Sequence, residues 1–270
     1  MMRDRLITAA VLAAIILPLL FWGRTAGIAI LVAMACTLAL WELCTNMPGL
    51  KGSHSVWLAI GLGLVIVALF YLLPFTSLLL VPALLPLVVL IIHLLLYDVI
   101  ENTVESASQM VFALGYVVVP LCHAILMRRL DMGVTLVLYI LIVVCLGDTG
   151  AYFSGKYLGK HPLAPKISPS KTVEGLGGVV AGGLLGMVFM KTVVPDLPGY
   201  EVLLPLTLAL VVAGPVGDLI ASALKRRLEI KDFGTAIRGH GGLMDRADSL
   251  IVAFPTGYYF LILTGHFIPK

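Results

Sequence analysis

The feature that most constrains the fold of this chain is a series of apolar runs, each about 20 residues long. A helix of this length crosses the roughly 30 Å hydrocarbon core of a bilayer, where every backbone polar group needs an internal hydrogen bond. The two-residue alternation typical of a transmembrane β-barrel is absent. The sequence therefore predicts an all-α polytopic membrane protein, a bundle of about nine helices. The nine expected spans are 6–22, 27–46, 55–73, 77–97, 108–127, 133–153, 173–194, 201–222 and 248–267.

The composition supports a membrane protein and excludes several other classes. Hydrophobic residues make up 60% of the 270 residues and charged residues only 12%, roughly half the fraction of a typical soluble domain. The four cysteines lie within or at the ends of apolar runs and form no Cys-x-x-Cys motif, so we expect neither disulfides nor a cysteine metal site. No stripe of basic and aromatic residues indicates nucleic-acid binding. We expect one integral membrane domain over residues 1–270.

The distribution of Lys and Arg predicts the orientation of the chain. Nine spans place the termini on opposite sides, and cytoplasmic segments carry the excess of Lys and Arg. A cytoplasmic N-terminus places thirteen of these residues inside and five outside, and it brings the polar loops 154–172 and 223–247 to the cytoplasmic face. The inside residues are Arg3, Arg5, Lys51, Lys156, Lys160, Lys166, Lys171, Lys225, Arg226, Arg227, Lys231, Arg238 and Arg246; the outside ones are Arg24, Arg128, Arg129, Lys191 and Lys270.

One polar stretch, residues 222–248, concentrates ionic residues in a mostly apolar chain. Basic side chains neutralise phosphate oxygens, glycines let backbone N–H groups approach them, and carboxylates are the hard ligands that Mg²⁺ prefers. The stretch therefore suits a polyphosphate with Mg²⁺. The alternative is a positive-inside loop that only fixes topology, which leaves the aspartates unexplained. The residues concerned are Lys225, Arg226, Arg227, Lys231, Arg238, Arg246, Asp232, Asp245, Asp248, His240, Gly241 and Gly242.

Ionisable side chains within a span are costly and by default functional, and Asp148 and Asp218 are two acidic residues placed in this way. Asp148 lies near the cytoplasmic end of the sixth span, and Asp218 lies in the eighth. Their neighbours support a site, because the spacing i, i+4, i+7 places Asp218, Ser222 and Lys225 on one helix face. The alternative for Asp218 is an ion pair with a nearby Lys or Arg.

The start of the ninth span adds two more carboxylates. Asp245 and Asp248, three residues apart, share a helix face. If spans eight and nine are neighbours, these residues and Asp218 can converge on one or two hard cations. Glu42 carries less information, since it follows Trp41 at the end of the second span, where we expect its carboxylate to reach water.

The polar loop before the seventh span has two interpretations that are compatible. Lys171 and the neighbouring hydroxyls precede a helix N-terminus, where free N–H groups and the helix dipole favour an anion. The simpler interpretation is a helix cap at Ser170 or Thr172, with Glu174 as an acid in the first turn. The order of residues excludes a Walker A loop.

These motifs together resemble those of the phosphatidate cytidylyltransferase (CDP-diacylglycerol synthase) family. Specific motifs carry the resemblance over about residues 147–249. The N-terminal half matches mainly through its helix pattern and Trp41-Glu42. The sequence departs from the family pattern at Ala221, Arg238 and Ala247, none of which is a presumed metal ligand. The matching motifs are Ser222-x-Leu-Lys225-Arg226, Lys231-Asp232-x-Gly234, Ile237-x₂-His240-Gly241-Gly242-Leu243-x-Asp245-Arg246-x-Asp248, Gly147-Asp148-Thr149-Gly150, Ser168-Pro169-x-Lys171-Thr172-x-Glu174-Gly175 and Gly217-Asp218.

The resemblance implies transfer of CMP from CTP to phosphatidic acid, in the cytoplasmic (inner) membrane of a bacterium. It implies Mg²⁺, with a second cation such as K⁺, and it leaves a homodimer open. Residues 1–130 would be scaffold and lipid access, and residues 131–270 would carry the catalytic motifs. The implied catalytic residues are Asp218, Asp245, Asp248, Lys225 and Arg246, the three aspartates holding the metal; the implied substrate-binding residues are Ser168, Lys171, Thr172, Ser222, Arg226, Lys231, Asp232, His240, Gly241, Gly242 and Asp148, the last orienting a lysine or binding metal.

Three rival functions stay open at this point. The nearest are other CTP-dependent lipid enzymes, namely a CDP-archaeol synthase or a polyprenol or phytol kinase, which releases CDP in place of pyrophosphate. An ion-coupled transporter would place its ionisable residues at mid-membrane depth on broken helices, whereas here they gather towards one face. A structural subunit without chemistry does not explain the density of placed polar residues.

Overall fold

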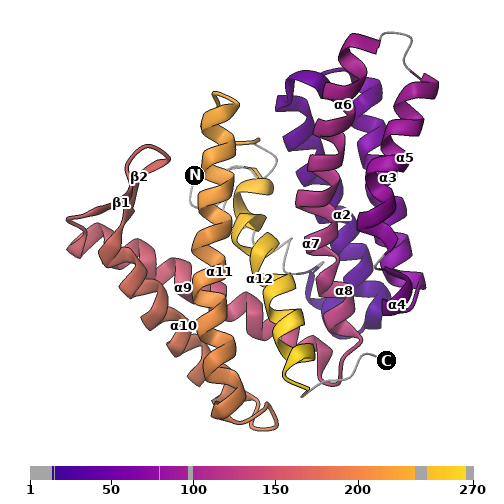
Figure 1. Ribbon diagram of the computed structural model, residues 1–270. Coiled ribbons are helices and arrows are strands. Elements are labelled where there is room, and N and C mark those ends of the chain that lie inside the picture. Colours follow the sequence, from indigo (N-terminus) through magenta and orange to yellow (C-terminus); the bar gives the residue numbers. More distant parts are fainter. Residues whose placement is uncertain (1–13, 15, 79, 97–99, 235–241, 266–270) are drawn as a thin grey trace. The chain divides into compact units, whose positions relative to one another are not determined.

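The computed structural model of the protein describes residues 14, 16–78, 80–96, 100–234 and 242–265, and helices dominate them (Figure 1). One short antiparallel hairpin interrupts the helices. The elements are α2 (Arg24–Asn46), η1 (Pro48–Leu50), α3 (Ser53–Leu72), α4 (Phe75–Leu78), α5 (Leu80–Leu96), α6 (Ile100–Ala113), the π-helical η2 (Leu114–Val118), α7 (Val119–Leu121), α8 (His123–Arg128), α9 (Gly133–Leu158), β1 (Pro162–Ala164), β2 (Ser168–Thr172), α10 (Val173–Val193), α11 (Tyr200–Arg227) and α12 (Met244–Leu263).

Six helical segments of the described chain are long and apolar enough to cross a membrane. The prediction of an all-α, multi-pass protein therefore agrees with the structure, but the count of nine spans is not confirmed. The first expected span, 6–22, lies mostly outside the described residues. Helix α5, with 17 residues, is shorter than the six, and the 20-residue α12 is not among them. The six segments are Arg24–Asn46, His54–Leu72, Thr103–Arg128, Gly133–Leu158, Val173–Val193 and Tyr200–Arg227.

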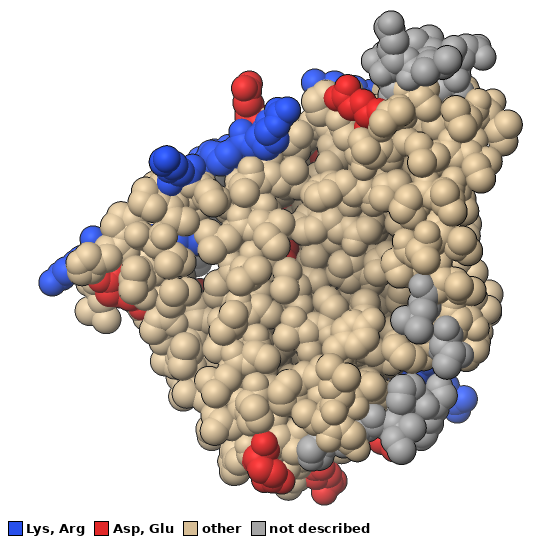
Figure 2. All heavy atoms as spheres, viewed as in Figure 1, with Lys and Arg blue, Asp and Glu red and all other residues tan. Residues whose placement is uncertain are grey.

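The surface of α5 shows how the apolar helices meet their surroundings. Leu84, Leu87 and Ile91, spaced by three and four residues, are 48%, 57% and 55% exposed. Val89 and His93 on another face are buried. An exposed apolar stripe of this kind fits a lipid environment, because water would favour polar residues there. Figure 2 accordingly shows a broad visible surface with few charged side chains.

The chain divides into two compact units. Among the described residues, the N-terminal unit comprises those before 127 together with 232–234 and 242–245, and the C-terminal unit comprises 127–231 and 246–265. In the N-terminal unit α2 lies along α3, and α5 lies along α6. The π-helical turn η2 precedes Pro120, which has no N–H to donate to the preceding turn and so disturbs regular helical hydrogen bonding there.

In the C-terminal unit, glycines allow α9 and α10 to approach closely. A Cβ at Gly150 would overlap the carbonyl group of Gly178, and a Cβ at Gly182 would overlap that of Leu146. Small residues thus let the two helix backbones lie closer than larger side chains would allow. Helix α11 contacts both α9 and α10, so these three helices form the frame of the unit.

The hairpin between α9 and α10 was not predicted. Helix α9 continues to Leu158, beyond the expected end of the span at residue 153, and the chain then pairs β1 with β2. The register joins Pro162 to Thr172 and Ala164 to Ser168. The hairpin returns the chain directly to the start of α10 and places Lys171 next to that helix N-terminus.

Candidate active site

Three aspartates from three helices come together in the C-terminal unit; we call Asp148, Asp218 and Asp248 the acidic cluster. Asp248 interacts electrostatically with both other members, and Asp148 interacts with Asp218. Helices α11 and α12 meet here, since a Cβ at Gly217 would overlap the carbonyl oxygen of Asp248. The expected proximity of spans eight and nine is therefore confirmed for these residues. Like charges near one another repel, and nearby cations can offset that repulsion.

Two lysines supply positive charge to the acidic cluster. The Lys171 Nζ lies 2.8 Å from Asp218 Oδ2, and the two side chains are 20% and 38% exposed. Lys225 interacts electrostatically with Asp248. The Ser222 Oγ lies 3.5 Å from Asp218 Oδ1, which agrees with the predicted shared face on α11. The ion pair that we considered as an alternative for Asp218 is thus present, and it lies within the cluster of acids.

Ser249 makes two further hydrogen bonds within the acidic cluster, one to Asp148 and one to Asp248. Asp148 hydrogen-bonds the side chain of Ser249, although the Asp148 side chain itself is exposed. The Ser249 N–H donates to Asp248 Oδ1 over 2.7 Å. The carboxylate and hydroxyl oxygens of the cluster are hard ligand atoms, so their chemistry fits Mg²⁺. Among the residues that the structure describes, no group of three or more His, Cys, Asp or Glu side chains is placed to hold a metal ion by itself.

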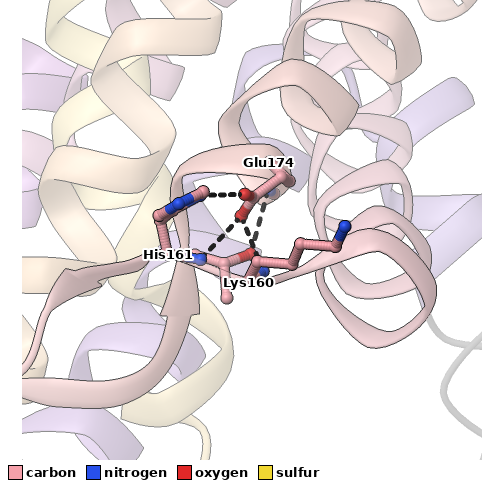
Figure 3. A network of polar contacts seen from close by, with 5 residues as sticks. Lys160, His161 and Glu174 are labelled. Atoms are coloured by element: carbon pink, nitrogen blue, oxygen red, sulfur yellow. Dashed lines mark hydrogen bonds and ion pairs between the residues drawn. The ribbon is translucent and has the colours of Figure 1, made fainter.

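Figure 3 shows the contacts that fix the hairpin carrying Lys171. The Glu174 carboxylate accepts hydrogen bonds from the Lys160 N–H, the His161 N–H and His161 Nδ1, over 3.1, 3.2 and 2.6 Å. Thr172 caps α10, because its Oγ1 accepts from the Gly175 N–H over 3.1 Å. Of the two residues considered as caps, Thr172 is therefore the one that serves. Lys171 is held directly beside a capped helix N-terminus.

The last turn of α11 holds the turn of the hairpin. Arg226 Nε donates to the Ile167 carbonyl over 3.1 Å, and Ser168, at the start of β2, is half-buried. This bond links the basic end of α11 to the segment that delivers Lys171. Arg226 thus contributes to the geometry of the site, in addition to its charge.

The two described ends of the segment 232–245, residues 232–234 and 242–245, belong to the N-terminal unit and contact each other there. The Asp245 Oδ2 accepts from the Phe233 N–H over 2.9 Å. The Glu42 carboxylate, on α2, accepts from the Leu243 N–H over 3.0 Å and the Met244 N–H over 2.8 Å. Glu42 is only 4% exposed, so the expectation that it reaches water was wrong. The N–H groups at the start of α12 have no partner within the helix, so they hydrogen-bond the Glu42 carboxylate and replace the water expected at the membrane surface.

The remaining predicted residues are placed as follows. Lys231, Asp232 and Arg246 are exposed, and Gly242 is buried. His240 and Gly241 lie outside the described residues, as does Arg238. Asp218 and Asp248 belong to the C-terminal unit and Asp245 to the N-terminal unit, so a ligand set of all three stays a prediction. Sequence reasoning missed the roles of Glu42 and Ser249: Glu42 was a polar residue in an apolar run, and Ser249 directly follows Asp248 in the polar first part of α12.

These features define a multi-pass helical membrane protein with a cation-flanked, oxygen-rich site suited to a phosphorylated ligand. The chain belongs to the cytidylyltransferase family, whose model matches residues 3–264. It is 34% identical to the phosphatidate cytidylyltransferase of Bacillus subtilis over 285 residues, which cover 97% of this chain and 98% of the relative. It is 39% identical to that of Haemophilus influenzae over 171 residues, covering 57% and 58%. The resemblance seen in the sequence motifs is confirmed.

Proposed function

We propose that the protein transfers CMP from CTP to phosphatidic acid, giving CDP-diacylglycerol and pyrophosphate. The observation that carries this proposal is the acidic cluster flanked by Lys171 and Lys225, in a chain of the cytidylyltransferase family. A site of this composition matches two substrates that both carry phosphate. Its relatives that bear the name phosphatidate cytidylyltransferase favour this reaction over the rival lipid kinases.

The reaction needs little covalent help from the protein. An oxygen of the phosphatidate phosphate attacks the α-phosphorus of CTP, a new P–O bond forms, and the bond from that phosphorus to the oxygen bridging to the β-phosphate breaks. Pyrophosphate leaves with the electron pair. Because the attacking oxygen is already an anion, no general base is required. Catalysis rests on bringing two anions together and on stabilising the charge that moves to pyrophosphate.

The carboxylates of the site would hold Mg²⁺. Asp218, Asp248 and Asp245 are the proposed ligands, with Asp148 beside them and K⁺ as a second cation. The bound ion supplies positive charge at the triphosphate. Since the described residues offer no complete ligand set, substrate phosphates and water would complete it, which is common for Mg²⁺.

The basic residues would bind and orient the phosphates. Lys171 pairs with Asp218, and a phosphate oxygen can share that ammonium group. Lys225 and Arg226 at the end of α11 would meet the triphosphate or the lipid phosphate. These residues would lie at the cytoplasmic side of a bacterial inner membrane, with the N-terminus on the same side. The acyl chains would stay in the bilayer, and a homodimer stays a prediction.

The direct test uses purified full-length protein, phosphatidic acid in detergent micelles and CTP labelled at the α-phosphate. We expect label in a lipid product only when CTP, phosphatidic acid and Mg²⁺ are all present, with release of pyrophosphate. Release of CDP without labelled lipid would identify a CTP-dependent kinase. Absence of both products would leave a transporter as the better explanation and overturn the proposal.

A further inference from the structure

Two polar residues near the end of α2 hold both ends of the segment that leads to Asp245. Glu42 and Asn46 are four residues apart and so lie on one face of the helix. Glu42 accepts the N–H groups of Leu243 and Met244 at one end of the segment. At the other end, Asn46 Nδ2 donates to the Phe233 carbonyl over 2.9 Å. We call this pair the α2 clamp; all its contacts lie within the N-terminal unit.

The clamp is tightly built. A Cβ at Gly234 would lie 2.6 Å from Glu42 Oε1, and a Cβ at Gly242 would lie 2.6 Å from Glu42 Oε2. Both glycines therefore give the Glu42 carboxylate room between the two ends of the segment. A carboxylate that is 4% exposed is costly unless hydrogen bonds compensate its charge, and here two backbone N–H groups at a helix N-terminus do so.

The clamp also reaches the carboxylate of Asp245. The Phe233 backbone is fixed on its carbonyl side by Asn46, and its N–H donates to Asp245 Oδ2 over 2.9 Å. Glu42 fixes the two residues directly before Asp245 in the chain. The side chain and the backbone of Asp245 are thus both located by contacts that originate on α2, about two hundred residues earlier in the sequence.

We propose that Glu42, assisted by Asn46, is a positioning residue that sets the orientation of Asp245 for metal binding. This inference rests on the proposed function, in which Asp245 is a metal ligand. It gives the N-terminal helices a part in the chemistry beyond scaffold and lipid access. Glu42 itself touches neither substrate nor metal, and it acts through the backbone of residues 243–244.

The first arm of the test measures hydrogen–deuterium exchange of the full-length protein in detergent, without substrate or metal. In Glu42→Gln the amide oxygen can replace only one of the two acceptors, and the charge at the helix N-terminus is lost. We expect amides in peptides covering 243–244 to exchange about tenfold faster or more. Glu105→Gln is the control, because Glu105 is an exposed carboxylate on α6 of the same unit. Unchanged exchange in Glu42→Gln would overturn the proposal.

The second arm measures CDP-diacylglycerol formation across a Mg²⁺ titration. For Glu42→Gln we expect the Mg²⁺ concentration at half-maximal rate to rise about fivefold to tenfold, with the KM for phosphatidic acid unchanged. Asn46→Ala should shift the midpoint in the same direction but less, since it removes only one hydrogen bond to the segment, the one to the Phe233 carbonyl. A role in folding alone would lower the amount of active protein without moving the Mg²⁺ midpoint, and that result would also overturn the proposal.

The two arms separate the failure of this inference from the failure of the proposed function. Wild-type protein that forms no CDP-diacylglycerol would overturn the function, while exchange would still decide whether Glu42 holds the segment. Wild-type turnover with an unshifted Mg²⁺ midpoint in Glu42→Gln would overturn the positioning role and leave the function intact.

Discussion

The buried carboxylate of the α2 clamp and the carboxylates of the acidic cluster show two opposite uses of an acid in an apolar protein. Glu42 is almost fully buried, and two backbone N–H groups hold its two oxygens. Asp218 is 38% exposed, pairs with Lys171 and lies near two other acids. The first arrangement is stable as it stands. The second keeps negative charges close together, and that arrangement favours the binding of a cation.

The first way to test this distinction is Asp245→Asn, for which we expect the largest effect. An amide oxygen can still accept from the Phe233 N–H, so the segment should keep its closure while the negative charge is lost. If Asp245 serves as a metal ligand, turnover should fall by about a thousandfold or more, roughly 4 kcal/mol. The measurement is CDP-diacylglycerol formation, with thermal melting to verify that the variant folds.

The matched control for Asp245→Asn is Glu201→Gln, which removes an exposed carboxylate from the first turn of α11. It should leave turnover within about twofold of wild type, as expected for a surface substitution. Turnover close to wild type in Asp245→Asn would place Asp245 with Glu42, as an acid that only orders the chain, and would remove it from the metal site.

Lys171→Gln tests the cationic side of the acidic cluster and should have the next largest effect. The substitution removes the partner 2.8 Å from Asp218 and one of the charges available to a phosphate. We expect the KM for CTP to rise about tenfold to a hundredfold, in line with about 1.5–3 kcal/mol for a hydrogen bond to a charged group. Lys171→Arg should recover part of the loss. Lys166→Gln, at an exposed lysine of the same hairpin, should change little.

A result in which Lys171→Gln lowers the melting temperature but leaves the KM for CTP unchanged would contradict this role. Lys171 would then serve only to neutralise Asp218. The acidic cluster would then resemble the α2 clamp, because the charge of Asp218 would be neutralised only to stabilise the folded protein.

The sequence predicted the elements that depend on local pattern. Apolar runs located the helices 24–46, 133–158 and 200–227 with ends at most five residues from those expected, because spanning length and hydropathy are properties of a continuous segment. Helical spacing placed Ser222 beside Asp218 in the same way. The family motifs also include Lys171 of β2 and Asp218 of α11, which form an ion pair in the structure.

The remaining features depend on contacts between residues that are distant in the sequence, and residue spacing within one segment does not predict such contacts. Glu42 meets Met244 across 202 positions of the chain, and nothing in the apolar run around Glu42 indicates that partner. The hairpin was missed because its strands have only three and five residues and carry the polar, proline-containing sequence of a loop. Its stability comes from the contacts of Glu174 and Arg226, which are also non-local.

Thr172→Val should produce the smallest effect and addresses whether the hairpin is scaffold or binding element. Valine has nearly the same shape and suits the extended backbone of Thr172, so the change removes the hydroxyl that accepts from Gly175. Loss of this cap should cost about 1 kcal/mol of stability, seen as a small decrease in melting temperature. Ser170→Ala, at the exposed neighbour that does not cap the helix, should leave the melting temperature unchanged. If turnover of Thr172→Val falls about tenfold or more at a temperature where the protein stays folded, the hydroxyl also contacts substrate, and the hairpin takes part in the chemistry together with the acidic cluster. If turnover only follows the folded fraction, Thr172 belongs with Glu42 among the residues that hold the site in place.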